Sequence, residues 1–114
     1  MDVIKLFKKL LESYSVTPEE GGIFDFLEGY LDEFTFVRVD HEEVKNLFAY
    51  RRFGEGPHLC FAGHVDVVPP GEGWESDPFV ATEKEGYIYA RGAQDMKSGV
   101  AAFVQALKDA QEFK

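Results

Sequence analysis

The chain has 114 residues, of which 45% are hydrophobic and 15% aromatic, so it is long enough for one domain and too apolar to be disordered throughout. Its net charge of −9 at pH 7 makes nucleic acid and anionic membranes poor partners and favours metal ions or cationic groups. With one cysteine, no apolar run of the ~20 residues that span a bilayer, and no signal peptide, the sequence predicts a cytoplasmic protein.

The first third of the chain is expected to form two amphipathic helices. Residues 2–14 carry apolar side chains at helical spacing, namely Val3, Phe7, Leu10, Leu11 and Tyr14. The second helix is predicted to begin at Thr17. There Thr17 as N-cap, Pro18 in the first turn and Glu20 three residues after the cap are typical of a helix N-terminus. Its apolar side chains continue to Phe34.

From residue 35 the apolar period changes from that of a helix to that of a strand. Strands are predicted over 35–40, 46–53 and 59–63, a hairpin over 79–82 and 87–90, and a last helix over 96–113. The run 59–63 is wholly apolar, which predicts a central strand buried on both faces, with Cys60 inside it. Helices before and after such strands predict an α/β layered domain with a mixed, mainly parallel β-sheet flanked by helices.

His64 and Asp66 directly follow the predicted central strand, at the edge where open α/β sheets place their ligand sites. Their i, i+2 spacing directs both side chains to one side of an extended backbone. A histidine can bind a metal through one ring nitrogen while its other nitrogen donates to a carboxylate. Because two residues make a weak motif, a solvated pair at a strand end remains the alternative to a metal site.

Asp95 lies in the segment 91–99, which joins a predicted strand to the last helix. At the carboxyl end of a strand its carboxylate could reach the same metal site, but as a residue before a helix it could equally be an N-cap. The residues before Lys97 lack the glycine pattern of a Walker A loop, which excludes that phosphate-binding motif. His41 and His58 are expected to be exposed or structural.

Two blocks of sequence together resemble the opening half of the M20 family of metallopeptidases and deacylases. The first block covers 61–71 with Trp74 and 77–79, the second covers 92–97, and residues 15–18 also fit. The resemblance extends over essentially the whole chain and implies part of a zinc-exopeptidase-like catalytic domain. Within the family it is nearest to the enzymes that hydrolyse N-succinyl-LL-2,6-diaminopimelate to succinate and LL-2,6-diaminopimelate in lysine and diaminopimelate biosynthesis.

The resemblance also implies the composition of the site. Two zinc ions, for which Co²⁺ is a substitute, would share a bridging carboxylate and a water. His64 would be a ligand of one zinc, Asp95 would bridge both, and Asp66 would be the catalytic residue that orients His64. The peptide bond between Asp95 and Met96 is implied to be cis.

Family members continue beyond the counterpart of residue 114 with an adjacent pair of glutamates, another acidic ligand, a last histidine and a lid domain used for dimerisation. Residues 1–114 are therefore expected to be the N-terminal part of an M20-type catalytic domain, without the lid domain. Alone they are expected to be inactive and to hold zinc weakly or not at all. The parent, completed by the remainder of the domain, is expected to be a homodimer that acts on a small N-succinyl amino acid. Another M20 amidohydrolase, such as acetylornithine deacetylase or a dipeptidase, and a non-catalytic metal-binding or interaction module remain alternatives.

Overall fold

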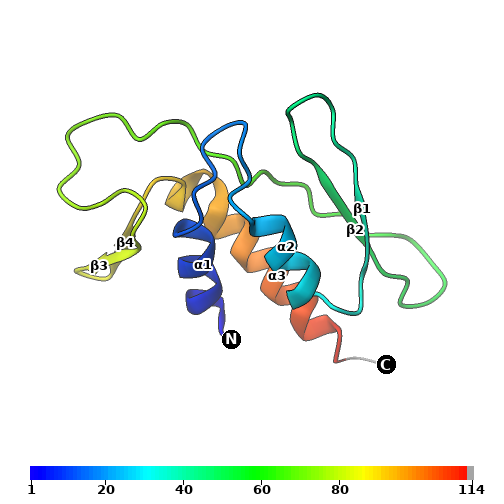
Figure 1. The fold of residues 1–114 in the computed structure, drawn as a ribbon. Coiled ribbons are helices and arrows are strands. Elements are labelled where there is room, and N and C mark those ends of the chain that lie inside the picture. The colour runs from blue at the N-terminus through cyan, green and yellow to red at the C-terminus, as the bar shows by residue number, and fades with distance from the viewer. Residues whose placement is uncertain (113–114) are drawn as a thin grey trace.

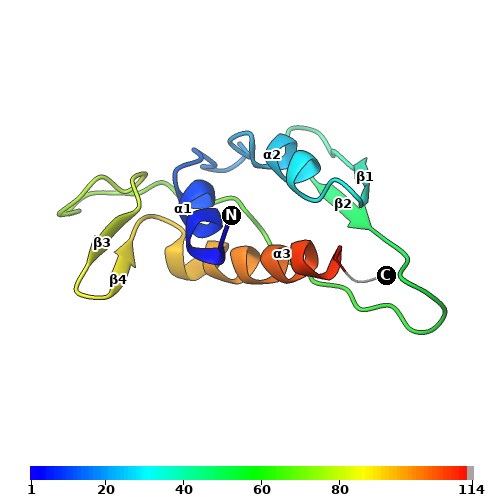
Figure 2. The same cartoon turned by 90° about the horizontal axis from the view of Figure 1, so that it is seen from below.

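The computed structural model describes residues 1–112 and has helices at its centre with a β-hairpin on either side (Figure 1). In chain order the elements are α1 (Val3–Leu11), α2 (Ile23–Tyr30), β1 (Thr35–Arg38), β2 (Leu47–Tyr50), β3 (Thr82–Lys84), β4 (Tyr87–Tyr89), a π-helical turn (Ala93–Lys97) and α3 (Ser98–Ala110). The chain is elongated, with extents of 51 × 37 × 22 Å, because the two hairpins lie toward opposite ends of α3 (Figure 2).

The core lies where the three α-helices meet. Its buried side chains are Leu6, Leu10, Ile23, Phe24, Leu27, Leu31, Val100, Ala101 and Val104. The helix predicted over 2–14 is confirmed as the shorter α1, which Asp2 caps by accepting a hydrogen bond from the Lys5 amide. The helix predicted over 96–113 is confirmed as α3, and residue 113 lies outside the described residues. No helix within residues 1–112 is long and apolar enough to cross a membrane.

The second helix begins later than the capping pattern predicts. The N-cap of α2 is Gly22, and the Glu20 carboxylate accepts hydrogen bonds from two main-chain amides at the start of the helix. The prediction that Thr17 is the N-cap is wrong, because Gly21 and Gly22 have positive φ, which interrupts any helix that begins at Thr17. The Thr17 amide donates to the Val67 carbonyl oxygen at 3.0 Å.

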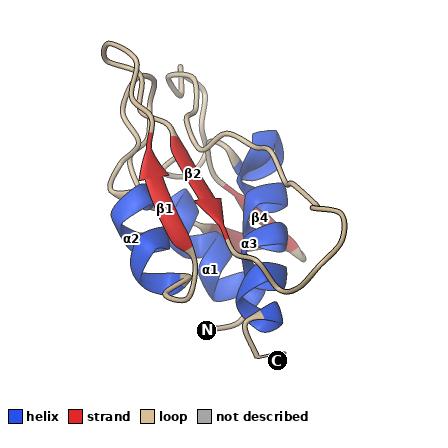
Figure 3. Cartoon of the chain, turned by 90° about the vertical axis from the view of Figure 1, so that its right-hand side faces the viewer, coloured by secondary structure: helices blue, strands red, loops and turns tan. Residues whose placement is uncertain are grey.

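The strands predicted over 35–40 and 46–53 are present in shorter form and pair as a hairpin, and the predicted hairpin is present with its first strand displaced from 79–82 to Thr82–Lys84. β1 pairs antiparallel with β2, with Thr35 opposite Tyr50, and β3 pairs antiparallel with β4. Figure 3 shows β1 and β2 side by side with the helices behind them. The chain is therefore α/β, as predicted, but the mainly parallel sheet is not found in the described part. There the parallel pairing is limited to a bridge between Val16 and Val67.

Residues 59–63 form no strand in the described structure, contrary to the prediction of a buried central strand. Leu59 is 83% exposed, Phe61 is 43% exposed, and the Cys60 thiol is exposed as well. An extended segment becomes a strand only when a neighbour shares its main-chain hydrogen bonds, and no strand of residues 1–112 pairs with this one. The segment packs on α3 where the rings of Phe61 and Phe103 stack at a centroid distance of 5.2 Å.

Candidate metal centre

Two loops meet beside the N-terminal end of α3, and each brings one block of the predicted site. The approach is closest at Gly92, which has a φ of +92° and where a Cβ would lie 2.6 Å from Cγ1 of Val67. Gly63 is also tight, since a Cβ there would lie 3.2 Å from the side chains of Met96 and Phe103. Glycine at these two positions therefore allows the loops to touch, and at Gly92 it also permits the left-handed backbone.

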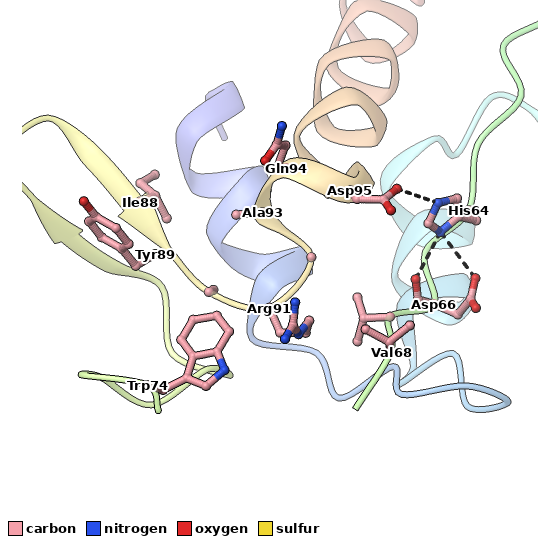
Figure 4. Close-up of a pocket in the computed structure, with 13 residues that line it drawn as sticks. His64, Asp66, Val68, Trp74, Ile88, Tyr89, Arg91, Ala93, Gln94 and Asp95 are labelled. Atoms are coloured by element: carbon pink, nitrogen blue, oxygen red, sulfur yellow. Dashed lines mark hydrogen bonds and ion pairs between the residues drawn. The ribbon is translucent and has the colours of Figure 1, made fainter. Parts of the chain in front are cut away.

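His64 lies between Asp66 and Asp95 with one ring nitrogen toward each of them (Figure 4). Its Nδ1 is 3.0 Å from the Asp66 carbonyl oxygen and 3.4 Å from Oδ1 of the same residue. Its Nε2 is 3.0 Å from Oδ1 of Asp95. Because a carbonyl oxygen and an ionised carboxylate can only accept, both ring nitrogens donate in this arrangement, and Nδ1 is the one that keeps its proton when a cation replaces the proton on Nε2. The structure thus brings all three predicted site residues together.

The two acidic neighbours set the protonation of His64. Burial alone would lower its pKa, but the hydrogen bonds to the Asp66 carbonyl and to Asp95, together with the two negative charges, raise the pKa above the ordinary value of 6.5. Water reaches the pair, since the side chain of His64 is 46% exposed and that of Asp95 is 87% exposed. A cation that replaced the Nε2 proton would meet one imidazole nitrogen and one carboxylate.

Asp95 belongs to the π-helical turn and is not a helix cap. Its φ of −121° and ψ of 94° are non-helical, and the peptide bond between Asp95 and Met96 is cis, as the resemblance implies. α3 begins at Ser98, and the residue at its N-cap position is Lys97, which makes no side-chain capping bond. The alternative role of Asp95 as an N-cap is therefore wrong, and its carboxylate faces His64 instead.

Lys97 is a residue of the site region that sequence reasoning missed. It is 1% exposed, and its Nζ donates to the carbonyl oxygens of Leu10, at 2.8 Å, and Ser13, at 3.2 Å. Burial lowers its pKa from 10.5 to about 8. The turn that carries Asp95 is thereby joined to the C-terminal end of α1. The available signal was a lysine set among the small and apolar residues at the start of the last helix.

An open pocket of about 400 Å³ lies beside the three site residues. Trp74 and Arg91 line it on another side, with the guanidinium 5.2 Å from the centre of the indole ring (Figure 4). Both side chains donate a hydrogen bond to the Pro70 carbonyl oxygen, which fixes them against the loop. His41 and His58 are exposed, as predicted, and neither lines this pocket.

The donors at this place fit part of a zinc site. Imidazole nitrogen and carboxylate oxygen are both zinc ligands, and Asp66 holds the opposite ring nitrogen as such sites require. Zinc takes three or four protein ligands, whereas within residues 1–112 no group of three His, Cys, Asp or Glu side chains is placed to bind one ion. His64 and Asp95 would therefore hold zinc only together with further ligands.

Comparison with known sequences supports the family resemblance that the two blocks of sequence indicate. The sequence model of peptidase family M20/M25/M40 matches residues 60–114. The chain is also similar to proteins named succinyl-diaminopimelate desuccinylase. It is 64% identical over 113 residues to that of Sulfurimonas denitrificans, 63% over 114 to that of Nautilia profundicola, and 65% over 113 to that of a Nitratiruptor species.

These three alignments cover 99%, 100% and 99% of this chain but 31% of each relative, so the chain spans about a third of their length. The similarity therefore describes one segment of those longer proteins. Within that limit the match is unambiguous, because it includes both blocks that carry the three site residues. Residues 60–114 match the sequence model of the M20 peptidase family, as the sequence blocks predict.

Proposed function

We propose that residues 1–114 are the N-terminal part of the catalytic domain of a zinc-dependent amide hydrolase. The proposed substrate is N-succinyl-LL-2,6-diaminopimelate, which is cleaved to succinate and LL-2,6-diaminopimelate. The names and the 63% to 65% identities of the relatives support this substrate over those of acetylornithine deacetylases and dipeptidases. Since the chain spans about a third of those relatives, the activity is proposed for the complete protein that carries this segment, and the segment alone is proposed to be inactive.

The observation that carries the proposal is the position of His64 between two aspartates. We assign His64, through Nε2, and Asp95 as metal ligands, because these two groups face each other at 3.0 Å on the wall of an open pocket. We assign the Asp66 carboxylate, with Oδ1 3.4 Å from Nδ1, the role of keeping the proton on Nδ1 together with the main-chain carbonyl oxygen, so that the lone pair of Nε2 stays available. The ligands that complete the site are proposed to lie outside this segment.

The chemistry that zinc supplies in such a site is Lewis acidity, which polarises a carbonyl group and makes water more acidic. The residues of this chain contribute binding and orientation. His64 and Asp95 fix the position of the cation, and Asp66 fixes the ring of His64. The general base is proposed to come from the remainder of the domain, which is why this segment alone is expected to show no turnover.

The proposal is tested on the complete protein by measuring turnover of N-succinyl-LL-2,6-diaminopimelate and zinc content on the same preparations. His64→Ala and Asp95→Ala should each abolish turnover and lower the zinc content. Asp66→Ala should lower activity about 10–100-fold, the usual loss for a residue that orients a metal ligand, and should weaken zinc binding without abolishing it. His58→Ala is the matched control. Because His58 is an exposed histidine outside the pocket, this variant should change neither turnover nor zinc content.

Three results would overturn the proposal. Near-normal activity without His64 would refute the assignment of the site. Faster turnover of N-acetylornithine than of the succinylated substrate would move the protein to a different M20 amidohydrolase. Turnover by the purified 114-residue chain would show that the residues described here are sufficient by themselves.

In the complete domain we propose that residues 59–63 become an inner strand of a layered, mainly parallel sheet. Their apolar side chains and unpaired main chain support this, since both need neighbouring strands that residues 1–112 do not provide. Amide hydrogen exchange compares the two forms directly. Amides of 59–63 should exchange rapidly in the 114-residue chain and slowly in the complete protein, and equal rates would refute the strand.

We further propose that the complete protein is a cytoplasmic homodimer. The single cysteine is consistent with a reducing compartment, and the dimer is proposed from the resemblance to the M20 family. Sedimentation of the complete protein tests the dimer, and a monomer at all concentrations would refute it.

A further inference from the structure

The segment 13–17, which follows α1, touches both loops of the candidate metal centre. On one side the Ser13 carbonyl oxygen accepts a hydrogen bond from Nζ of Lys97, at 3.2 Å, in the π-helical turn. On the other side the buried Ser15 hydroxyl donates to the Val65 carbonyl oxygen at 2.7 Å. This short segment therefore connects the two parts of the site, although it belongs to neither block that predicted them.

Main-chain hydrogen bonds fix Thr17 within this segment. Its amide donates to the carbonyl oxygen of Val67 at 3.0 Å, and the amide of Val67 donates to the carbonyl oxygen of Ser15 at 2.9 Å. The backbone of Thr17 is thus held beside the loop that carries Asp66. Its side chain is presented to that loop without help from its own hydroxyl.

The Thr17 hydroxyl donates to Oδ2 of Asp66. The other acceptor within reach, the Val67 carbonyl oxygen, is farther away at 3.4 Å. The second carboxylate oxygen of Asp66, Oδ1, lies 3.4 Å from Nδ1 of His64. With Oδ2 engaged by Thr17, the carboxylate is restrained from turning, and it faces His64 together with the Asp66 carbonyl oxygen.

From this geometry we infer that Thr17 is a positioning residue of the proposed metal centre, which acts through Asp66 to hold His64 with Nε2 directed toward Asp95. The inference rests on the proposed function. It assigns the Thr17 hydroxyl a role separate from folding, because the main-chain bonds to Val67 would be kept by any residue with an amide. Valine has the shape of threonine without the hydroxyl, and serine has the hydroxyl without the methyl group.

The experiment uses the complete protein and the variants Thr17→Val and Thr17→Ser. Thr82→Val is the matched control, because the Thr82 hydroxyl bonds only its neighbour's carbonyl oxygen, that of Val80, away from the site. Zinc affinity is measured by competition with a chelating dye, and the visible absorption spectrum of the Co²⁺-substituted protein reports the geometry of the ligands. Both measurements are independent of turnover.

Thr17→Val should weaken zinc binding about ten-fold, the low end of the range for residues behind a metal ligand, and should change the Co²⁺ spectrum. It should lower kcat with little change in KM, since Thr17 reaches the reaction only through His64. Thr17→Ser should restore affinity and spectrum, and Thr82→Val should change neither. In an Asp66→Ala background Thr17→Val should add no further loss, whereas a general folding defect would add to it.

Wild-type affinity and spectrum in Thr17→Val would overturn the inference, as would equal losses in the valine and serine variants or additive losses with Asp66→Ala. His64→Ala separates this failure from failure of the proposed function. If His64→Ala loses zinc while Thr17→Val does not, only the role of Thr17 is refuted. If His64→Ala binds zinc like the wild type, the metal centre itself is refuted and the role of Thr17 with it.

Discussion

Replacement of Lys97 tests how the turn that carries Asp95 is held. The side chain is almost completely buried, and its ammonium group donates to the carbonyl oxygens of Leu10 and Ser13. Lys97→Met keeps most of the aliphatic stem and removes the charge, whereas Lys97→Ala removes both. Lys84→Met serves as the matched control, because Lys84 is an exposed lysine on β3.

The structure sets the size of each effect. Both variants lose the hydrogen bonds to the two carbonyl oxygens and remove the buried charge. Lys97→Ala also leaves a cavity against the core, which should lower the free energy of unfolding by about 2–5 kcal/mol more than Lys97→Met does. The lowering of the Lys97 pKa from 10.5 to about 8 corresponds to a burial penalty on the order of 3 kcal/mol at neutral pH. Because the loss of the hydrogen bonds and the removal of the buried charge oppose each other, Lys97→Met should shift the free energy of unfolding by less than about 2 kcal/mol.

The sign of the pH dependence follows from the lowered pKa. Between pH 8 and pH 10.5 the unfolded chain keeps a lysine proton that the folded chain has released, so the free energy of unfolding rises with pH in this window. The hydrogen bonds to the two carbonyl oxygens favour the ammonium form and make the rise smaller. Lys97→Met lacks this titration, so the wild type should gain stability relative to the variant as the pH rises through the window.

Urea unfolding followed by circular dichroism, at pH values below and above 8, measures these differences on the 114-residue chain. The reasoning is refuted if Lys97→Met is as destabilising as Lys97→Ala and the difference from wild type does not change with pH. That result would mean that the ammonium group is solvated and that burial does not penalise it. Lys84→Met should show neither effect.

Three further predictions concern other parts of the chain. Gly92→Ala should lower the melting temperature more than Gly73→Ala, because both glycines have positive φ but a Cβ would meet the Val67 side chain only at Gly92. The Cys60 thiol should react with Ellman's reagent at the rate of a free thiol in a peptide, and Cys60→Ser should shift the free energy of unfolding by less than about 0.5 kcal/mol. Arg38→Leu should cost less than about 1 kcal/mol, and added salt should reduce the difference, because the carboxylate contacts of Arg38 lie at the surface.

The elements that could be predicted from the sequence are those whose stability is local or comes from the helical core. The helix over 2–14, the first two strands and the hairpin that follows them later in the chain are signalled by period and turn residues, and their neighbours in sequence are also their neighbours in space. The capping pattern at Thr17 is equally strong locally, yet it fails because Gly21 and Gly22 take positive φ and the helix begins only after them. Thr17 is held instead by a main-chain hydrogen bond to Val67, far away in sequence, and a single-sequence pattern carries no information on such a distant contact.

The three site residues were predicted to meet at the edge of a sheet, and the structure brings them together without that sheet. Two glycines allow this close approach. Gly63 lets the loop of His64 approach Met96 and Phe103, and Gly92 lets the loop that leads to Asp95 approach Val67. Lys97 then ties the second loop to α1 from inside the core. The burial of this lysine could not be predicted from apolar periodicity, because periodicity treats lysine as a surface residue.

The sequence pattern predicts that one buried strand, 59–63, both packs in the core and presents the site residues. In the structure these two roles belong to different segments. The helices and the segment 13–17 orient His64 and Asp95 toward each other, whereas the apolar run 59–63 contributes only through Phe61 and the glycine at its end. If the inner strand forms only in the complete domain, then residues 59–63 take up their strand pairing next to two metal ligands, His64 and Asp95, that are already oriented. The entropy of orienting these two ligands would then be lost on folding of the helical core and not on arrival of the metal, which favours binding of the ion.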